Sequence, residues 1–156
     1  MKIALYQPDI PQNTGTILRL AACLGIAVDI IEPCGFVWND RKLKRSGMDY
    51  LDQVNLTRHN SWEAFQAAQS PSHRLVLLST KAEMAYTDFT FTPDDILLMG
   101  RESAGVPDAV HQSADARLII PMRPELRSIN VAICAAMVVG EALRQTGGFY
   151  HDITAG

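Results

Sequence analysis

Three loops of this sequence gather glycine, proline and polar residues of the types that bind ligands or take part in catalysis. They span residues 7–19, 99–107 and 120–130, and each follows a short apolar run typical of a buried strand. In parallel α/β sheets, ligands gather where the strands reach their carboxyl ends. We therefore expect a binding or catalytic site to be built from these three loops.

The first loop carries an amide and a cation at the start of a helical pattern. Asn13 and Gly15 can shape a turn, and Arg19 follows Gly15 by just over one helical turn. The structural interpretation makes Asn13 a helix cap and Arg19 a solvated charge. Composition alone favours that structural interpretation over a functional one.

The second loop is rich in glycine. Gly100 and Gly105 permit a close approach of the backbone to a ligand, and Glu102 between them can accept hydrogen bonds. The loop lacks the Gly-Lys-Ser/Thr of a phosphate-binding P-loop, and its spacing does not match the Gly-x-Gly-x-x-Gly dinucleotide fingerprint. It therefore predicts either a ligand site of another kind or an ordinary glycine-rich turn.

The third loop is stiffened by two prolines, Pro121 and Pro124, and ends with Ser128 and Asn130 at the mouth of the last predicted helix. The backbone amides and carbonyls of such a rigid loop can bracket a purine or an amino-acid moiety. Simple capping of the helix is the alternative.

Other common chemistries find no support in the sequence. It contains no Gly-x-Ser-x-Gly elbow, and its four histidines lack metal-ligand spacing and lie far in sequence from any plausible nucleophile. We predict no metal, with the histidines at the surface or in polar networks. The three cysteines are odd in number and lack paired spacing, so we expect buried or idle thiols in a reducing compartment.

Alternating apolar runs and helical patterns must position these loops. We predict strands at 2–6, 27–31, 74–78, 95–99 and 117–120, and helices at 14–24, 61–69 and 130–145. Asn13 or Thr14 should cap the first helix and Ser61 the second, and Gly25 lies just past the first helix. This order predicts an α/β fold, with a mostly parallel sheet flanked by helices, in a single domain over residues 1–156.

The last predicted helix is apolar nearly all round, from Val131 to Val139. A helix without a polar face must be covered on every side. The simplest cover for the side that faces away from the core is a second copy of the chain. The alternative is a helix wrapped fully by its own domain.

Composition and charge bound the possible partners. The formal net charge of −3 argues against a generally basic RNA-coating protein, so any nucleic acid must meet a local patch. No apolar stretch approaches the roughly 20 residues that cross a bilayer, and no signal segment is apparent. We expect a cytoplasmic protein with no membrane association. Its densest positive cluster consists of Arg41, Lys42, Lys44 and Arg45.

Taken together, the loops resemble those of the SPOUT methyltransferases, specifically the small subgroup that modifies the ribose of the wobble nucleotide in tRNA. The resemblance covers almost the whole chain. It is carried by Asn13-Thr-Gly-Thr-Ile-Leu-Arg19, Gly100-Arg-Glu-Ser-Ala-Gly-Val-Pro107 and Ile120-Pro-Met with Ser128-Ile-Asn130, together with Ile31-Glu-Pro-Cys-Gly-Phe36 and the basic cluster that follows it. The order and separation of these motifs in so short a chain make a specific signature.

The resemblance implies that the C-terminal part threads a deep trefoil knot and that S-adenosylmethionine binds there. The cofactor would be held mostly by backbone groups of three loops. Carried onto this chain, the cofactor-binding residues are Leu78, Ser79, Thr80, Gly100, Glu102, Gly105, Ile120, Met122 and Ser128.

The resemblance also implies methyl transfer to the 2′-hydroxyl of the pyrimidine at nucleotide 34, in tRNA-Leu isoacceptors, by a homodimer with a shared active site. A guanidinium is a poor base, since its pKa is above about 12, so Arg19 would orient the ribose and stabilise the developing alkoxide. The other catalytic residues would be Asn13, Glu102, Ser128 and Asn130. The anticodon stem-loop would dock on Arg41, Lys42, Lys44 and Arg45, helped by Arg123 and Arg127.

Two positions depart from the family pattern. Gly140 stands where close relatives have an aromatic residue, and Ala132 stands at a usually small polar position. The first departure bears on the tRNA species accepted. Two other functions stay open, which are methylation of another tRNA or rRNA position and a non-catalytic RNA-binding role.

Overall fold

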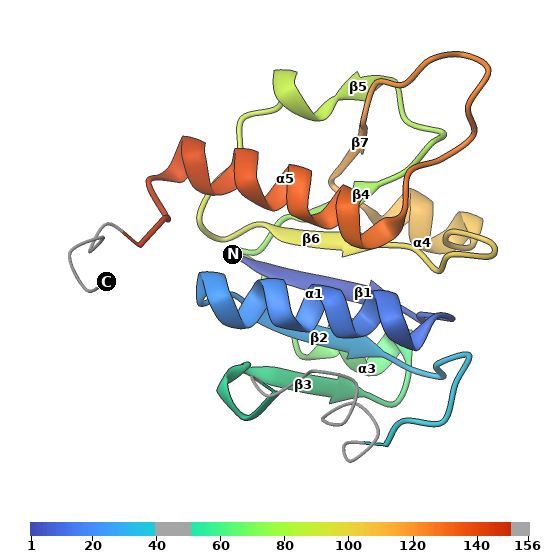
Figure 1. The fold of residues 1–156 in the computed structure, drawn as a ribbon, viewed down its shortest axis with the longest axis vertical. Helices are drawn as coiled ribbons and strands as arrows, with labels where there is room; N and C mark the ends of the chain where they lie inside the picture. Colours follow the sequence, from blue (N-terminus) through green and yellow to red (C-terminus); the bar gives the residue numbers. More distant parts are fainter. Residues whose placement is uncertain (40–50, 151–156) are drawn as a thin grey trace.

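The computed structural model describes residues 1–39 and 51–150 (Figure 1). A seven-stranded sheet forms the centre, with the strand order β3-β2-β1-β6-β4-β7-β5. Every paired strand is parallel to its neighbour. The strands are β1 (Lys2–Tyr6), β2 (Ala27–Ile31), β3 (Leu56–His59), β4 (Leu75–Leu78), β5 (Met84–Ala85), β6 (Ile96–Met99) and β7 (Ala116–Ile119).

Helices cover both faces of the sheet. The helices α1 (Pro11–Leu24) and α5 (Val131–Thr146) lie side by side on one face, while α3 (Trp62–Ala67) and α4 (Asp108–Ser113) lie on the other (Figure 1). Two short 3₁₀ helices, η1 (Leu51–Gln53) and η2 (Tyr86–Asp88), complete the described elements. The α/β class and the parallel sheet flanked by helices are therefore confirmed. The deep trefoil knot stays a prediction.

The core consists of two layers, because successive residues of a strand point to opposite faces. Ile3 and Leu5 of β1 pack in the cluster that contains the buried residues of α1 and α5. Ala4 of β1 packs with Phe65 of α3 and Val110 of α4. Burial on both faces explains why the central strands read as continuous apolar runs.

The first helix begins earlier than predicted, so the expectation that Asn13 or Thr14 caps it is wrong. Helix α1 starts at Pro11, and Ile10 at the cap position makes no side-chain capping bond. Proline suits the first helical position because its fixed φ is helical and no N–H is needed there. At the other end Gly25 adopts φ 66°, as expected of a residue that ends a helix.

The other two predicted helices are confirmed, each with its cap. The Ser61 hydroxyl accepts a hydrogen bond from the Ala64 amide at 3.1 Å. The Asn130 side chain accepts from the amides of Ala132, at 2.9 Å, and Ile133, at 3.4 Å. Helix α5 is not fully wrapped by its own chain, since Ile133 is 56% and Met137 37% exposed.

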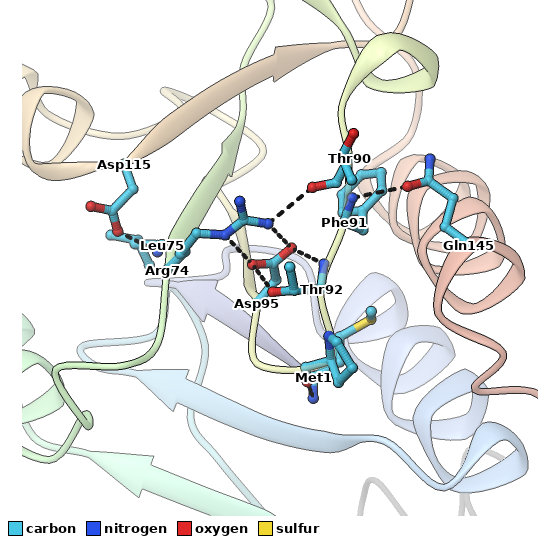
Figure 2. Close-up of polar contacts among 10 residues, drawn as sticks. Met1, Arg74, Leu75, Thr90, Phe91, Thr92, Asp95, Asp115 and Gln145 are labelled. Atoms are coloured by element: carbon cyan, nitrogen blue, oxygen red, sulfur yellow. Dashed lines mark hydrogen bonds and ion pairs between the residues drawn. The ribbon is translucent and has the colours of Figure 1, made fainter.

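An ion pair between the partly exposed Arg74 and the buried Asp95 ties the amino ends of β4 and β6 together. Asp95 is fully buried and accepts two hydrogen bonds from Arg74, at 2.7 and 2.8 Å (Figure 2). Gln145 of α5 fastens the adjoining segment, accepting from the Phe91 amide at 2.9 Å and donating to the Phe89 carbonyl at 3.0 Å. Pairing of this kind compensates the cost of burying a charge. The network holds the sheet at the end opposite the three loops.

The described residues also test the predictions about histidine, cysteine and membrane association. His59 lies in a buried polar pair with Asp29, 3.0 Å away, as expected of a network histidine. Cys23, Cys34 and Cys134 are free thiols. Among residues 1–39 and 51–150, none of the helices has the length and apolar character that a bilayer crossing needs.

Candidate active site

A cavity of about 400 Å³ opens at the carboxyl ends of β4, β6 and β7. Its walls come from the loops that follow these three strands, from Ile10 and Asn13 near the start of α1, and from the first turn of α5. This is the edge of the sheet at which the sequence predicts a site. The strand order brings these loops together, since β6, β4 and β7 are neighbours in the sheet.

The loop after β4 forms one wall with Leu78, Ser79 and Thr80. The Ser79 amide donates to the carbonyl of Leu118 at 2.9 Å, which continues the β4–β7 pairing one residue past the strand. The Ser79 hydroxyl accepts from the Lys81 amide at 3.1 Å and so turns the chain. These two hydrogen bonds fix the position of the loop directly after Leu78, the apolar last residue of β4.

The glycine-rich loop after β6 forms the second wall and closes on itself. Arg101 and Gly105 exchange two backbone hydrogen bonds, at 3.0 and 2.8 Å. A Cβ at Gly100 would lie 2.8 Å from backbone atoms of Gly105, and Gly105 itself has φ 67°. Glycine is needed at Gly100 for close approach and at Gly105 for the left-handed conformation. The two ends of the loop can therefore pack backbone against backbone at these glycines.

The third wall comes from the loop after β7, through Ile120, Met122 and Ser128. A turn within this loop is closed by a hydrogen bond of 3.0 Å from the Leu126 amide to the Arg123 carbonyl. Beyond the loop, apolar atoms of Ile129, Val131 and Cys134 continue the wall into α5.

A chain of polar side chains joins the loops at the cavity. Glu102 accepts a hydrogen bond from the Asn13 amide group at 3.1 Å and another from the Asp9 backbone amide at 2.8 Å. The Asn13 carbonyl oxygen accepts from the Asn130 side chain at 2.9 Å. Asn130 in turn caps α5. Asn13 is only 9% exposed, so its two side-chain bonds replace the water that burial removes.

The structure gathers most of the residues named from the sequence. The residues expected to bind the cofactor all line the cavity, as do Asn13 and Asn130. Arg19 lies on the exposed side of α1 and is not among the lining residues of the described chain. The basic residues Arg41, Lys42, Lys44 and Arg45 fall outside the described residues.

Sequence reasoning missed several lining residues, among them His111, Lys81 and Cys134. His111 belongs to α4, which was not predicted. Cys134 had a usable signal, because it follows Asn130 by one helical turn and must face the same side. Burial raises the pKa of the Cys134 thiol to about 11, so it is a protonated, weakly polar part of the wall.

The walls suit an organic ligand with an apolar part and several hydrogen-bonding groups. Strand-end side chains such as Leu78 and Ile120 offer apolar contact, and the glycine-rich loop presents backbone groups. Among the described residues, no group of three or more histidine, cysteine or acidic side chains is placed to hold a metal ion.

Comparison with known proteins identifies the same family that the three loops resemble. The model of the SpoU rRNA Methylase family matches residues 1–140. A protein of Beijerinckia indica named tRNA (cytidine(34)-2'-O)-methyltransferase is 70% identical over 146 residues, which are 93% of this chain and 91% of the relative. The Escherichia coli K12 protein of that name is 41% identical over 149 residues, 94% of each chain.

Solved structures agree with the sequence relatives. One, from work on the 2-OH methylation of C/U34 on tRNA, has a TM-score of 0.87 at 40% identity and covers 92% of this chain and 94% of its own. AviRb, a SpoU methyltransferase of Streptomyces viridochromogenes in complex with AdoMet, has a TM-score of 0.78 at 29% identity, over 93% and 60% of the two chains. The resemblance seen in the three loops is confirmed, and the chain belongs to the SpoU rRNA Methylase family.

Proposed function

We propose that this chain transfers a methyl group from S-adenosylmethionine to the ribose 2′-hydroxyl of the pyrimidine at nucleotide 34 of tRNA. The observation that carries the proposal is the cavity, whose three walls are the loops that carry the resemblance to SPOUT methyltransferases. The relatives support the substrate, since three that are 41–70% identical are named for methylation of cytidine 34 in tRNA.

The residues present fit S-adenosylmethionine. Leu78 and Ile120 provide apolar surface for an adenine ring, and Gly100, which also lines the cavity, lets the loop pack closely on Gly105. Ser79, Thr80, Met122 and Ser128 complete the walls around the remaining groups. The bound cofactor supplies a sulfonium methyl that is already activated for transfer to oxygen.

The chain's part in the reaction is to place the ribose and to stabilise charge on its oxygen. The chain of hydrogen bonds from Glu102 through Asn13 to Asn130 fixes three loops around the reacting region. Arg19 orients the 2′-hydroxyl. Its positive charge stabilises the negative charge that develops on the ribose oxygen as the proton leaves. As a guanidinium it donates hydrogen bonds and does not itself take the proton, which passes to water while the C–S bond of the cofactor breaks and S-adenosylhomocysteine leaves.

We further propose a homodimer in which each cavity is completed by the partner subunit's Arg19. Arg19 is exposed on α1, outside the cavity walls of its own chain. The neighbouring helix α5 exposes Ile133 and Met137 one helical turn apart, which is the apolar stripe that a second copy would cover. The tRNA anticodon stem-loop would then lie across both subunits.

Local positive charge must dock the RNA, because the chain as a whole is acidic. Arg123 and Arg127 are exposed on the loop that forms the third wall. With Arg41, Lys42, Lys44 and Arg45, they supply the cations that would meet the phosphates. Binding of tRNA is therefore expected to weaken steeply with salt, whereas cofactor binding is not. We propose that the protein acts on tRNA in the cytoplasm.

The proposal is tested by methyl transfer from labelled S-adenosylmethionine to bulk bacterial tRNA, with mapping of the modified nucleoside. A 2′-O-methylpyrimidine at position 34 is the expected product. Transfer to ribosomal RNA instead would favour the activity that the family's name describes. Cofactor binding without transfer to any RNA would indicate a binding protein.

The role of Arg19 has its own test. Arg19→Ala should lower kcat by about a hundredfold or more, the usual effect of removing a group that stabilises an oxyanion. The dissociation constant of S-adenosylmethionine should stay unchanged, because the proposal places Arg19 at the ribose hydroxyl and not against the cofactor. Normal turnover in this variant, with unchanged affinity for tRNA, would show that the assignment is wrong.

A further inference from the structure

The short segment 7–9, between β1 and α1, is held by other loops at each of its residues. Gln7 adopts the left-handed φ of 45°, and its carbonyl accepts a hydrogen bond from Arg101 Nε at 3.3 Å. The Pro8 carbonyl accepts from the Gly35 amide at 2.9 Å. A left-handed conformation at a residue other than glycine persists only where surrounding contacts hold it. The segment therefore serves as a fixed support for whatever rests on it.

The glycine-rich loop rests on this support through the carboxylate of Asp9. One oxygen, Oδ2, accepts from the Ser103 backbone amide at 3.1 Å and also from the Ser103 hydroxyl. The other, Oδ1, lies 3.6 Å from Arg101 Nε. The hydrogen bond from the Ser103 hydroxyl holds the pKa of Asp9 below its ordinary value, so the group is an anion at neutral pH.

The contact between Asp9 and Ser103 lies outside the cavity lining. Arg101, Glu102, Ala104 and Gly105 line the cavity, whereas Ser103 and Asp9 do not. The backbone bonds between Arg101 and Gly105 close the loop on itself but do not fix it relative to the sheet. That anchoring comes from three contacts with the 7–9 segment: Arg101 donates to the Gln7 carbonyl, the Glu102 carboxylate accepts from the Asp9 amide, and the Asp9 carboxylate accepts from Ser103.

The segment after β2 packs against the Asp9 carboxylate through Gly35. A Cβ at Gly35 would lie 2.7 Å from Asp9 Oδ1 and 3.0 Å from the Asp9 Cα. Such a close approach leaves the Asp9 side chain little room to turn away from Ser103.

We infer that Asp9 is a positioning residue for the cofactor: its carboxylate clasps Ser103 and so fixes the glycine-rich loop as a wall of the cavity. This inference rests on the proposed function, because it takes S-adenosylmethionine as the ligand of that wall. Asp9 touches neither the cavity nor the reacting atoms and acts through the loop alone.

The test measures S-adenosylmethionine affinity by calorimetry for a set of variants. Asp9→Ala should weaken binding about tenfold, as expected for loss of charge-assisted hydrogen bonds that preorganise a site. With both substrates saturating, kcat should change by less than about twofold, the pattern of a lost binding contribution. Asp9→Asn, which keeps an acceptor for Ser103, should fall between the wild type and Asp9→Ala. Asp94→Ala, at an exposed aspartate of the amino edge, is the control and should bind as the wild type does.

A double-mutant cycle distinguishes the effect of the Asp9–Ser103 contact, which we call the clasp, from a general loss of stability. Ser103→Ala should weaken binding less than Asp9→Ala, and the double variant should be no weaker than Asp9→Ala, because both act through one contact. Additive losses, or an unchanged affinity in Asp9→Ala, would overturn the inference. Should Asp9→Ala not fold, Asp9→Asn and Ser103→Ala provide the same comparison. A wild type that binds no S-adenosylmethionine would refute the proposed function, whereas a wild type that binds it with no effect of Asp9 would refute the clasp alone.

Discussion

At the scale of single residues, two glycines of one loop carry different physical demands. A Cβ at Gly100 would meet backbone atoms of Gly105 at 2.8 Å, whereas a Cβ at Gly105 would meet nothing within 4 Å. Gly105 instead needs its φ of 67°. Gly105→Ala should therefore lower the free energy of unfolding by about 1–2 kcal/mol, the strain of a left-handed alanine. It should still bind S-adenosylmethionine, with an affinity lowered by less than about tenfold.

Gly100→Ala should abolish measurable cofactor binding, because two backbone segments must move apart to admit the methyl group. Calorimetric binding and denaturant unfolding of both variants make the comparison. If Gly100→Ala bound the cofactor as well as Gly105→Ala, the close approach of the two segments would not be what shapes the wall.

The cysteines offer a second test at this scale. Burial raises the pKa of both Cys34 and Cys134 to about 11, so at pH 8 they hold about a hundredfold less reactive thiolate than an ordinary thiol. Iodoacetamide should modify the exposed Cys23 first, as followed by peptide mass spectrometry. S-adenosylmethionine should slow labelling of Cys134, which lines the cavity, and leave Cys34 unchanged as an internal control. Equal protection of both would indicate general tightening of the fold.

Residues of the site were predictable where the family resemblance and a local pattern coincide. The resemblance assigned Leu78, Gly100 and Ile120 to the cofactor, and each of them lies where a buried apolar run gives way to a polar or rigid loop. The role of Asp9 was not predictable, because it depends on contacts with residues more than 90 positions away. No local spacing encodes such a contact.

At the scale of elements, helix α5 is stabilised by a polar cluster near its C-terminal end. The Glu141 carboxylate accepts hydrogen bonds from Arg144, at 2.8 and 2.9 Å, and from Gln145 at 2.8 Å. Gln145 also accepts from the Phe91 amide (Figure 2) and donates to the Phe89 carbonyl. The hydrogen bonds from Arg144, then that from Gln145, lower the pKa of Glu141 from 4.5 to about 2.

A lowered pKa in the folded state gives a stabilisation that is present above the ordinary pKa and lost as the pH falls through the lowered one. Glu141→Gln should therefore reduce the Tm by a constant amount between about pH 5 and pH 8, and the difference should vanish as the pH falls towards about 2. Glu83→Gln, at an exposed loop position, is the control. A difference that grew towards acid pH would contradict this account of the cluster.

Elements with a strong residue pattern were predictable. β6 is an unbroken apolar run, β2 is rich in β-branched residues, and α5 runs for 16 residues, so each was predicted within about one residue. β3 was missed because it is an edge strand with exposed Thr57 and Arg58. α4 has six residues, as α3 does, but no side-chain cap of the kind that Ser61 gives to α3 marks its start.

At the scale of the whole molecule, the proposed shared site predicts complementation between two inactive variants. Arg19→Ala lacks the arginine but keeps the cavity, and Gly100→Val loses the cavity but keeps Arg19. Mixed at equal amounts after dissociation, the two should recover about a quarter of wild-type activity, since half of the dimers then hold one intact site of two. No recovery, in mixtures shown by mass to contain the hybrid dimer, would place Arg19 in its own chain's site.

Gly140 of α5 is one of the two positions that depart from the expected family pattern. A Cβ at Gly140 would meet nothing within 4 Å, so packing within the described chain does not require glycine there. The effect of this departure on the tRNA species accepted stays a prediction.

The most direct measurement of the central claim compares two full-length tRNA-Leu substrates that differ at one atom. One has ribose at nucleotide 34 and the other has 2′-deoxyribose there, and each is incubated with the wild-type protein and labelled S-adenosylmethionine. The account predicts methyl transfer to the ribose form and none above background to the deoxy form, because the 2′-oxygen is the acceptor. Equal transfer to both substrates would show that the methyl group goes elsewhere, and it would contradict the proposed function.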